Sequence, residues 1–94
     1  MKPLWKISGK YAGVRNDDLL YDSTGKNVGF FEGEVAYSIH GKYIGEILNE
    51  NLIGKRLNIS YPIKGVRTVC SNISITKYAN RVSIANVGWN DPDF

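Results

Sequence analysis

The sequence predicts an all-β fold built from short β-hairpin repeats of about 16 residues, in a pseudo-symmetric closed or barrel-like arrangement with extra C-terminal strands. Three observations support this prediction. A turn motif of the form Gly-Lys-x-apolar recurs at a fixed spacing, which indicates repeated structural units. Apolar and polar residues alternate around each turn, which is the period of a half-buried strand. No long stretch shows the apolar spacing of a helix.

The turn motif sets the register of the repeat. Gly-Lys-Tyr-Ala-Gly at 9–13 recurs as Gly-Lys-Asn-Val-Gly at 25–29 and as Gly-Lys-Tyr-Ile-Gly at 41–45, with offsets of 25 − 9 = 16 and 41 − 25 = 16. A weaker fourth copy starts at Gly54, with an offset of 54 − 41 = 13 and with Asn58 in place of the second Gly. The first Gly of each copy supplies the positive φ that a tight hairpin needs.

Each unit is expected to contain two short strands. An aromatic residue stands four positions before each of the first three turns, and we expect these residues to face the centre of the assembly: Trp5, Tyr21 and Tyr37. The second strands are expected to place an apolar residue inward: Ala12, Val28, Ile44 and Leu57. A single hairpin is not stable in water, so the units must share one core. Closing the sheet also removes its exposed edges.

The chain length suits one domain, residues 1–94, with the repeat region at 1–59 and the C-terminal strands and tail at 60–94. Alternating residues predict strands in the runs 66–70, 73–76 and 82–85. Trp89 and Phe94 near the end either fold back to plug one end of the assembly or form an exposed tail that binds a partner.

The repeats at 25–30 and 41–46, led by Tyr21 and Tyr37, resemble the bacterial four-fold β flower domain family over about residues 3–59. The resemblance implies units arranged with pseudo-four-fold symmetry, and it carries no activity with it. A more distant similarity to PRC-barrel domains implies a small β-barrel adaptor.

Composition narrows the function classes. Cys70 is the single cysteine, so no internal disulfide can form, which fits a reducing compartment such as the cytoplasm. The N-terminus lacks the apolar core of a signal peptide, and no apolar run is long enough for a membrane span, so no membrane association is expected. The net charge of +3 is mild for a nucleic-acid binder.

Catalytic and metal chemistry have little support in the sequence. His40 is the single histidine and occupies a turn position where other units have Ser8, Thr24 and Ile53. Cys70 is expected to be a buried, inert thiol on a strand. One His and one Cys do not supply the usual zinc ligand set. We therefore expect a protein that is not an enzyme, with no catalytic residues, metal or cofactor.

Two features suggest partner binding. One lysine follows the turn glycine of every unit, and these lysines would form a positive rim: Lys10, Lys26, Lys42 and Lys55. The turns between units carry Asp17, Asp18, Glu32, Glu34 and Glu50 and would gather on the opposite rim. Tyr11 and Tyr43 are expected to point outward beside Lys10 and Lys42, where they could stack on nucleobases.

The first functional hypothesis is a non-catalytic protein-interaction or binding module, with a protein partner or with self-association. The alternative is binding of nucleic acid or another anionic ligand through the lysine rim and the exposed tyrosines. Solvated charged turns and plain aromatic packing would explain the same residues without any ligand.

Overall fold

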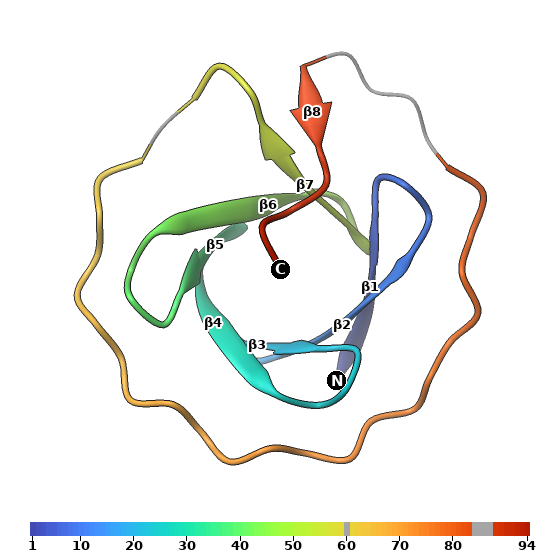
Figure 1. Ribbon diagram of the computed structural model, residues 1–94, viewed down its shortest axis with the longest axis horizontal. Coiled ribbons are helices and arrows are strands. Elements are labelled where there is room, and N and C mark those ends of the chain that lie inside the picture. Colours follow the sequence, from blue (N-terminus) through green and yellow to red (C-terminus); the bar gives the residue numbers. More distant parts are fainter. Residues whose placement is uncertain (60, 84–87) are drawn as a thin grey trace.

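A computed structural model describes residues 1–59, 61–83 and 88–94 and confirms the all-β fold class. Seven strands form a closed barrel in which sequential neighbours pair antiparallel, and a parallel pair between the first and seventh strands closes the ring (Figure 1). An eighth, short strand pairs with the seventh. The strands are β1 (Lys2–Lys6), β2 (Tyr11–Asn16), β3 (Leu19–Asp22), β4 (Asn27–Glu32), β5 (Val35–Ser38), β6 (Tyr43–Asn49), β7 (Leu52–Arg56) and β8 (Trp89–Asn90). The described residues contain no helix.

Three hairpins splay outward from the barrel, and we call them petals: β1–β2 is the first, β3–β4 the second and β5–β6 the third (Figure 1). Their turn glycines share one backbone conformation, because φ is 91° at Gly9, 87° at Gly25 and 84° at Gly41. The predicted repeat is therefore a structural repeat.

Each petal carries a β-bulge at the same place. In the first petal Leu4 pairs with Gly13 and Trp5 pairs with Tyr11, so Ala12 is the extra residue. The same shift recurs after Leu20 and after Ala36. The extra residues face inward as expected, because Ala12 and Ile44 belong to the central apolar cluster and Val28 packs against it.

The prediction that the lead-in aromatics face the centre is wrong for Trp5 and Tyr37. The central cluster contains the residues one position earlier, Leu4, Leu20 and Ala36. Trp5 and Tyr37 are buried in two separate clusters. A shift of one residue moves a side chain to the opposite face of a strand. The central cluster contains one aromatic residue, Phe31, and two alanines, so small residues at two petal positions leave room for one large ring.

The predicted fourth turn at Gly54 is also wrong, because Gly54 and Lys55 lie inside β7. The true register places Leu57 at the turn-glycine position, since 57 − 41 = 16. Leu57 is 55% exposed and does not face inward, and its N–H donates to the Gly88 carbonyl at 2.8 Å. β7 and β8 thus form an incomplete fourth petal, whose two strands are joined by the chain from 57 to 88.

This connection circles the three petals (Figure 1), and we call its described residues 61–83 the belt. The belt contacts each petal tip in turn, because the N–H groups of Lys64, Ile73 and Arg81 donate to the carbonyls of Gly41, Gly25 and Gly9 at 2.8, 2.9 and 2.6 Å. Strands predicted at 66–70 and 73–76 are absent, since these residues lie against petal tips and have no ladder partner. Of the run 82–85, residues 84 and 85 lie outside the described residues.

The C-terminal residues fold back over one end of the barrel, where the chain ends near the centre of the ring (Figure 1). Phe94 packs against the central cluster, Pro92 is buried, and the Asp93 N–H donates to the Ile44 carbonyl at 3.0 Å. The tail therefore plugs the barrel, and the exposed-tail alternative is wrong.

The belt contact predicts a large effect of adding one methyl group to a turn glycine. A Cβ on Gly25 would lie 1.9 Å from the Ile73 carbonyl oxygen, whereas a Cβ on Gly33, which also has a positive φ, would meet nothing within 4 Å. We expect Gly33→Ala to lower the free energy of unfolding by about 1 kcal/mol, the cost of the left-handed conformation, and Gly25→Ala to lower it by at least about 3 kcal/mol. Urea unfolding measures both, and equal losses would contradict the belt contact.

Candidate functional site

Tyr11 and Tyr43, predicted to be exposed, are buried beneath the belt, with 8% and 6% of their surface accessible. Belt aromatics cover them: the ring of Tyr78 lies 5.6 Å from that of Tyr11, and the ring of Tyr61 lies 4.8 Å from that of Tyr43. The prediction that they point outward is therefore wrong. The sequence did not show that aromatic residues from a distant segment would occupy this face.

The belt contacts the petals with a repeat of its own. A residue that packs on the second strand of a petal is followed three positions later by the residue that bonds to the turn glycine. The three pairs are Tyr61 and Lys64, Cys70 and Ile73, and Tyr78 and Arg81.

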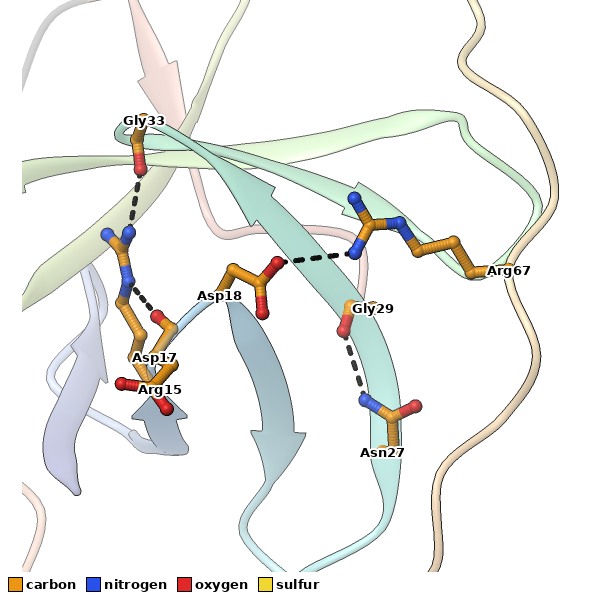
Figure 2. A network of polar contacts seen from close by, with 7 residues as sticks. All are labelled: Arg15, Asp17, Asp18, Asn27, Gly29, Gly33 and Arg67. Carbon is orange, nitrogen blue, oxygen red and sulfur yellow. Dashed lines mark hydrogen bonds and ion pairs between the residues drawn. The ribbon is translucent and has the colours of Figure 1, made fainter.

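At the second petal a polar contact replaces the aromatic pair. Buried Asn27 accepts a hydrogen bond from the Cys70 N–H at 3.0 Å and donates to the Leu20 and Gly29 carbonyls, the latter drawn in Figure 2. Cys70 is partly buried and lies on the belt, so the prediction of a fully buried thiol on a strand is wrong.

Three of the four rim lysines occupy equivalent places. Lys10, Lys26 and Lys42 are exposed at the petal tips, whereas Lys55 lies in β7 and forms an ion pair with Asp93. The belt adds four cations and no carboxylate, since residues 61–83 include Lys64, Arg67, Lys77 and Arg81 but no Asp or Glu. The edge of the molecule is therefore predominantly positive.

Acidic turns between the petals tie the structure together. Arg15 of β2 donates to the Asp17 and Gly33 carbonyls, both at 2.9 Å, and so joins two successive turns (Figure 2). Arg67 of the belt lies 3.4 Å from Asp18 in the same view, and Lys64 lies 3.5 Å from Glu32. These partly exposed pairs contribute little stability individually. They place belt cations beside the acidic turns, so the predicted separation into two opposite rims is incomplete.

A buried polar group lies under the third petal. Glu46, whose side chain is 8% exposed, accepts a hydrogen bond from the Tyr43 hydroxyl at 3.0 Å and lies 3.0 Å from the Arg56 guanidinium. The same hydroxyl accepts from the Arg56 backbone N–H at 3.0 Å. Burial raises the pKa of Tyr43 to about 12, against the opposing effect of the Arg56 N–H and with support from nearby Glu46.

Residues that could serve in catalysis or metal binding do not cluster within the described residues. His40 is exposed in the third petal's turn, as predicted, and its N–H donates to Ser38 Oγ at 3.3 Å. Within the described ranges no three His, Cys, Asp or Glu residues gather as a metal site would require. In that same part of the chain no helix is long and apolar enough to cross a membrane.

A family model described as "4-fold beta flower protein" matches residues 2–87. The chain belongs to this family. No curated protein and no solved structure matches it. The matched range extends beyond the petals and through the belt, so the belt belongs to the shared sequence pattern of the flower domain and is not an added segment.

The outer face of the flower's belt carries an apolar stripe. Belt residues facing the petals recur every third position, and the residues between them project outward. Ile63, Val66 and Val69 are 76%, 74% and 49% exposed, and the preceding Leu57 and Ile59 are 55% and 37% exposed. The sequence did not predict this stripe, because the alternation in this run indicated a strand with every second residue in a core.

A pocket of about 440 Å³ opens between the first and second petals of the flower. Three lysines line it, Lys6 and Lys10 of the first petal and Lys77 of the belt, together with Ser23, Thr24 and Tyr78. Of the lining residues, Lys10 and Tyr11 were predicted as binding residues. The signal for Lys6 is that other petals have Asp22 and Ser38 at the same position.

The Tyr43 hydroxyl predicts a pH-dependent contribution to stability. Replacing Tyr43 with Phe removes the hydrogen bond to buried Glu46, and we expect a loss of about 1–3 kcal/mol in the free energy of unfolding near neutral pH. Because the pKa of Tyr43 rises from 10.0 to about 12 on folding, the unfolded chain releases this proton first as the pH rises. The wild-type protein therefore loses stability between about pH 10 and pH 12.

Tyr43→Phe cannot lose this contribution, so the stability difference between the two proteins should shrink from about pH 9 to pH 11, as measured by urea unfolding. Tyr61→Phe, which alters the neighbouring belt ring, serves as the control. A difference for Tyr43→Phe that is the same at both pH values would contradict the assigned role of the hydroxyl.

Proposed function

We propose that this flower domain is a non-catalytic protein-interaction module that binds an extended, acidic and apolar segment of a protein partner along the outer face of the belt. The observation that carries the proposal is the apolar stripe of Ile63, Val66 and Val69 on the edge of the molecule. A row of exposed apolar side chains along one edge is a feature of protein-interaction sites.

The backbone of the belt favours an extended occupant. Lys64 and Arg67 direct their N–H groups inward to the third petal, at 2.8 Å from the carbonyls of Gly41 and Ile39. These two N–H groups are three residues apart and point the same way, so the belt follows a period of three here and does not present the alternating main-chain edge of a β-strand. An extended segment of a partner would therefore lie along the belt and contact the stripe through its side chains.

Charge determines which kind of segment fits. The belt residues 61–83 hold four basic and no acidic residues. Lys64 and Arg67 pair with Glu32 and Asp18, whereas Lys26 and Lys42 are exposed at the petal tips. Opposite charge on a partner speeds its association and orients it on the surface. A second copy of this chain would bring the same positive edge, so the charge pattern favours a different protein over self-association.

The alternative of nucleic-acid binding has less support than the sequence suggested, because the two tyrosines expected to stack on bases are buried. Stacking on Tyr11 and Tyr43 would require the belt to leave the petals, because both rings are buried. The lysines at the tips remain available for anions. Absence of an enzymatic role and a cytoplasmic location both remain part of the proposal, supported by the exposed turn position of the single histidine and by the single cysteine.

Selection from a random peptide library against the intact protein tests the proposal. We expect the selected peptides to combine acidic residues with Val, Ile or Leu, and their affinity to fall at least tenfold for the double variant Ile63→Ser and Val66→Ser. Because both side chains are mostly exposed, the variant should keep its free energy of unfolding to within about 0.5 kcal/mol for each change.

Ile75→Ser, on the partly buried face that packs near Trp5, is the control for loss of apolar surface elsewhere on the belt. Selected peptides that bind the double variant as tightly as the wild type would contradict the proposal. A stable dimer in sedimentation that the same two changes dissolve would also contradict it, because it would make self-association the use of the stripe.

A further inference from the structure

The pocket between the first and second petals is lined by a residue that departs from the repeat, Lys6. At the position occupied by Lys6, the second and third petals carry residues that cap their own turns. Asp22 Oδ1 accepts from the Thr24 and Lys26 N–H groups at 2.9 and 3.1 Å. Ser38 Oγ accepts from the N–H groups of His40 and Lys42, both at 3.3 Å. A lysine has no acceptor atom and cannot make this cap.

The first petal obtains its cap from another part of the chain. The Ser8 N–H, equivalent to those of Thr24 and His40, donates to Asp91 Oδ1 of the C-terminal tail at 2.9 Å. The tail therefore supplies the acceptor that the petal lacks. The Lys6 side chain therefore makes no cap in its own turn, and its ammonium group donates to the main-chain oxygen of Phe94 at 2.6 Å beside the pocket.

The electrostatics of the pocket favour an anion. Three lysines line it, Lys6, Lys10 and Lys77, and the Lys6 ammonium already donates one hydrogen bond to the main-chain oxygen of Phe94. Asp22 is the one carboxylate side chain in the lining, and its Oδ1 already accepts three hydrogen bonds, including one from Thr24 Oγ1 at 2.6 Å. Although desolvation alone would raise the pKa of Asp22, these hydrogen bonds lower it, so the carboxylate is committed to its own turn.

The remaining lining combines hydroxyls with flat apolar surface. Ser23 and Thr24 offer hydroxyl groups, and Tyr78, which is 44% exposed, lines the wall while its ring also packs against those of Trp5 and Tyr11. The volume of about 440 Å³ lies within the range of small-molecule sites. Lysine is a common point-charge ligand of phosphate, and an aromatic face accepts a planar ring.

We propose that this pocket binds a small phosphate monoester whose organic part carries a planar ring, with the three lysines around the phosphate and Tyr78 against the ring. The site is separate from the outer stripe of the belt, because Ile63 and Val66 lie beside the third petal and do not line it. Its ligand is therefore independent of the protein partner proposed above.

Titration of the intact, nitrogen-15-labelled protein with phenyl phosphate tests the proposal by amide chemical shifts. At about pH 8 the probe is a dianion. We expect saturable shifts at Ser23, Thr24 and Asn80, and an affinity that falls as salt is raised. Inorganic phosphate, which lacks the ring, and benzyl alcohol, which lacks the charge, should each bind at least fivefold more weakly than phenyl phosphate.

The charge-matched variants make the test specific. Lys10→Gln with Lys77→Gln should weaken phenyl phosphate binding at least tenfold, whereas Lys42→Gln with Lys64→Gln, which changes the same net charge on the third petal and its belt segment, should alter it less than threefold. Equal losses in the two variants would overturn the proposal in favour of a general positive field. Absence of saturable shifts at the pocket would overturn it as well.

Tyr78→Leu separates the ring contact from the charge contact. We expect it to weaken phenyl phosphate binding at least threefold while leaving binding of inorganic phosphate unchanged, and an unchanged affinity for phenyl phosphate would overturn the ring assignment. The belt variant Ile63→Ser with Val66→Ser should bind phenyl phosphate normally. A failure of the peptide-binding proposal would therefore leave this result intact, and the converse also holds.

Discussion

The close approach of the belt to three turn glycines is the contact on which the architecture depends. A Cβ at Gly9, Gly25 or Gly41 would lie 2.0, 1.9 or 1.9 Å from a belt carbonyl oxygen, closer than any carbon can approach. The glycines are thus required twice, once for the positive φ of the hairpin and once for the space in which the belt lies. The belt in that space buries the aromatic side chains on the outer face of the petals, which would otherwise be exposed: Trp5, Tyr11, Tyr37 and Tyr43.

The belt and the ring of petals span the same arc with different numbers of residues, for a geometric reason. The molecule is a disc of 34 × 32 × 17 Å, so a quarter of its circumference is roughly 26 Å, which an extended chain of about eight residues can span. The belt contacts successive petals at offsets of 73 − 64 = 9 and 81 − 73 = 8 residues. A petal uses 16 residues for the same quarter because its chain runs out and back. The belt is in effect the greatly enlarged turn of the fourth petal, whose strands are β7 and β8.

The sequence was sufficient for the fold class and for the turns at Gly9, Gly25 and Gly41, because glycine conformation and a 16-residue period are local signals, but not for the fourth turn, which it placed inside β7. It failed for side-chain direction at Trp5 and Tyr37, because the bulge that follows Leu4 and Ala36 depends on the curvature of a closed barrel. It also failed for the belt. The run 66–70 alternates as a strand would, but its inward residues follow a period of three set by the petal tips it touches. Tyr11 and Tyr43 were misplaced for the same reason, since their covering residues lie 78 − 11 = 67 and 61 − 43 = 18 positions away.

A residue that differs from its equivalents in the other petals indicates a place where the chain serves something other than the repeat. The packing of the petals requires only that each turn be capped and each tip touch the belt, and both conditions are met with Asp22 in one petal and Ser38 in another. Lys6 does not serve that purpose, and the tail compensates through Asp91. Keeping a lysine there costs a local cap and requires ordering of a distant segment, whereas a serine would satisfy the turn directly. The lysine has a structural use of its own, because its ammonium group donates to the main-chain oxygen of Phe94 at 2.6 Å and so helps to hold the tail over the barrel. What marks this side of the first petal as a ligand site is that Lys6 also lines a pocket together with Lys10 and Lys77.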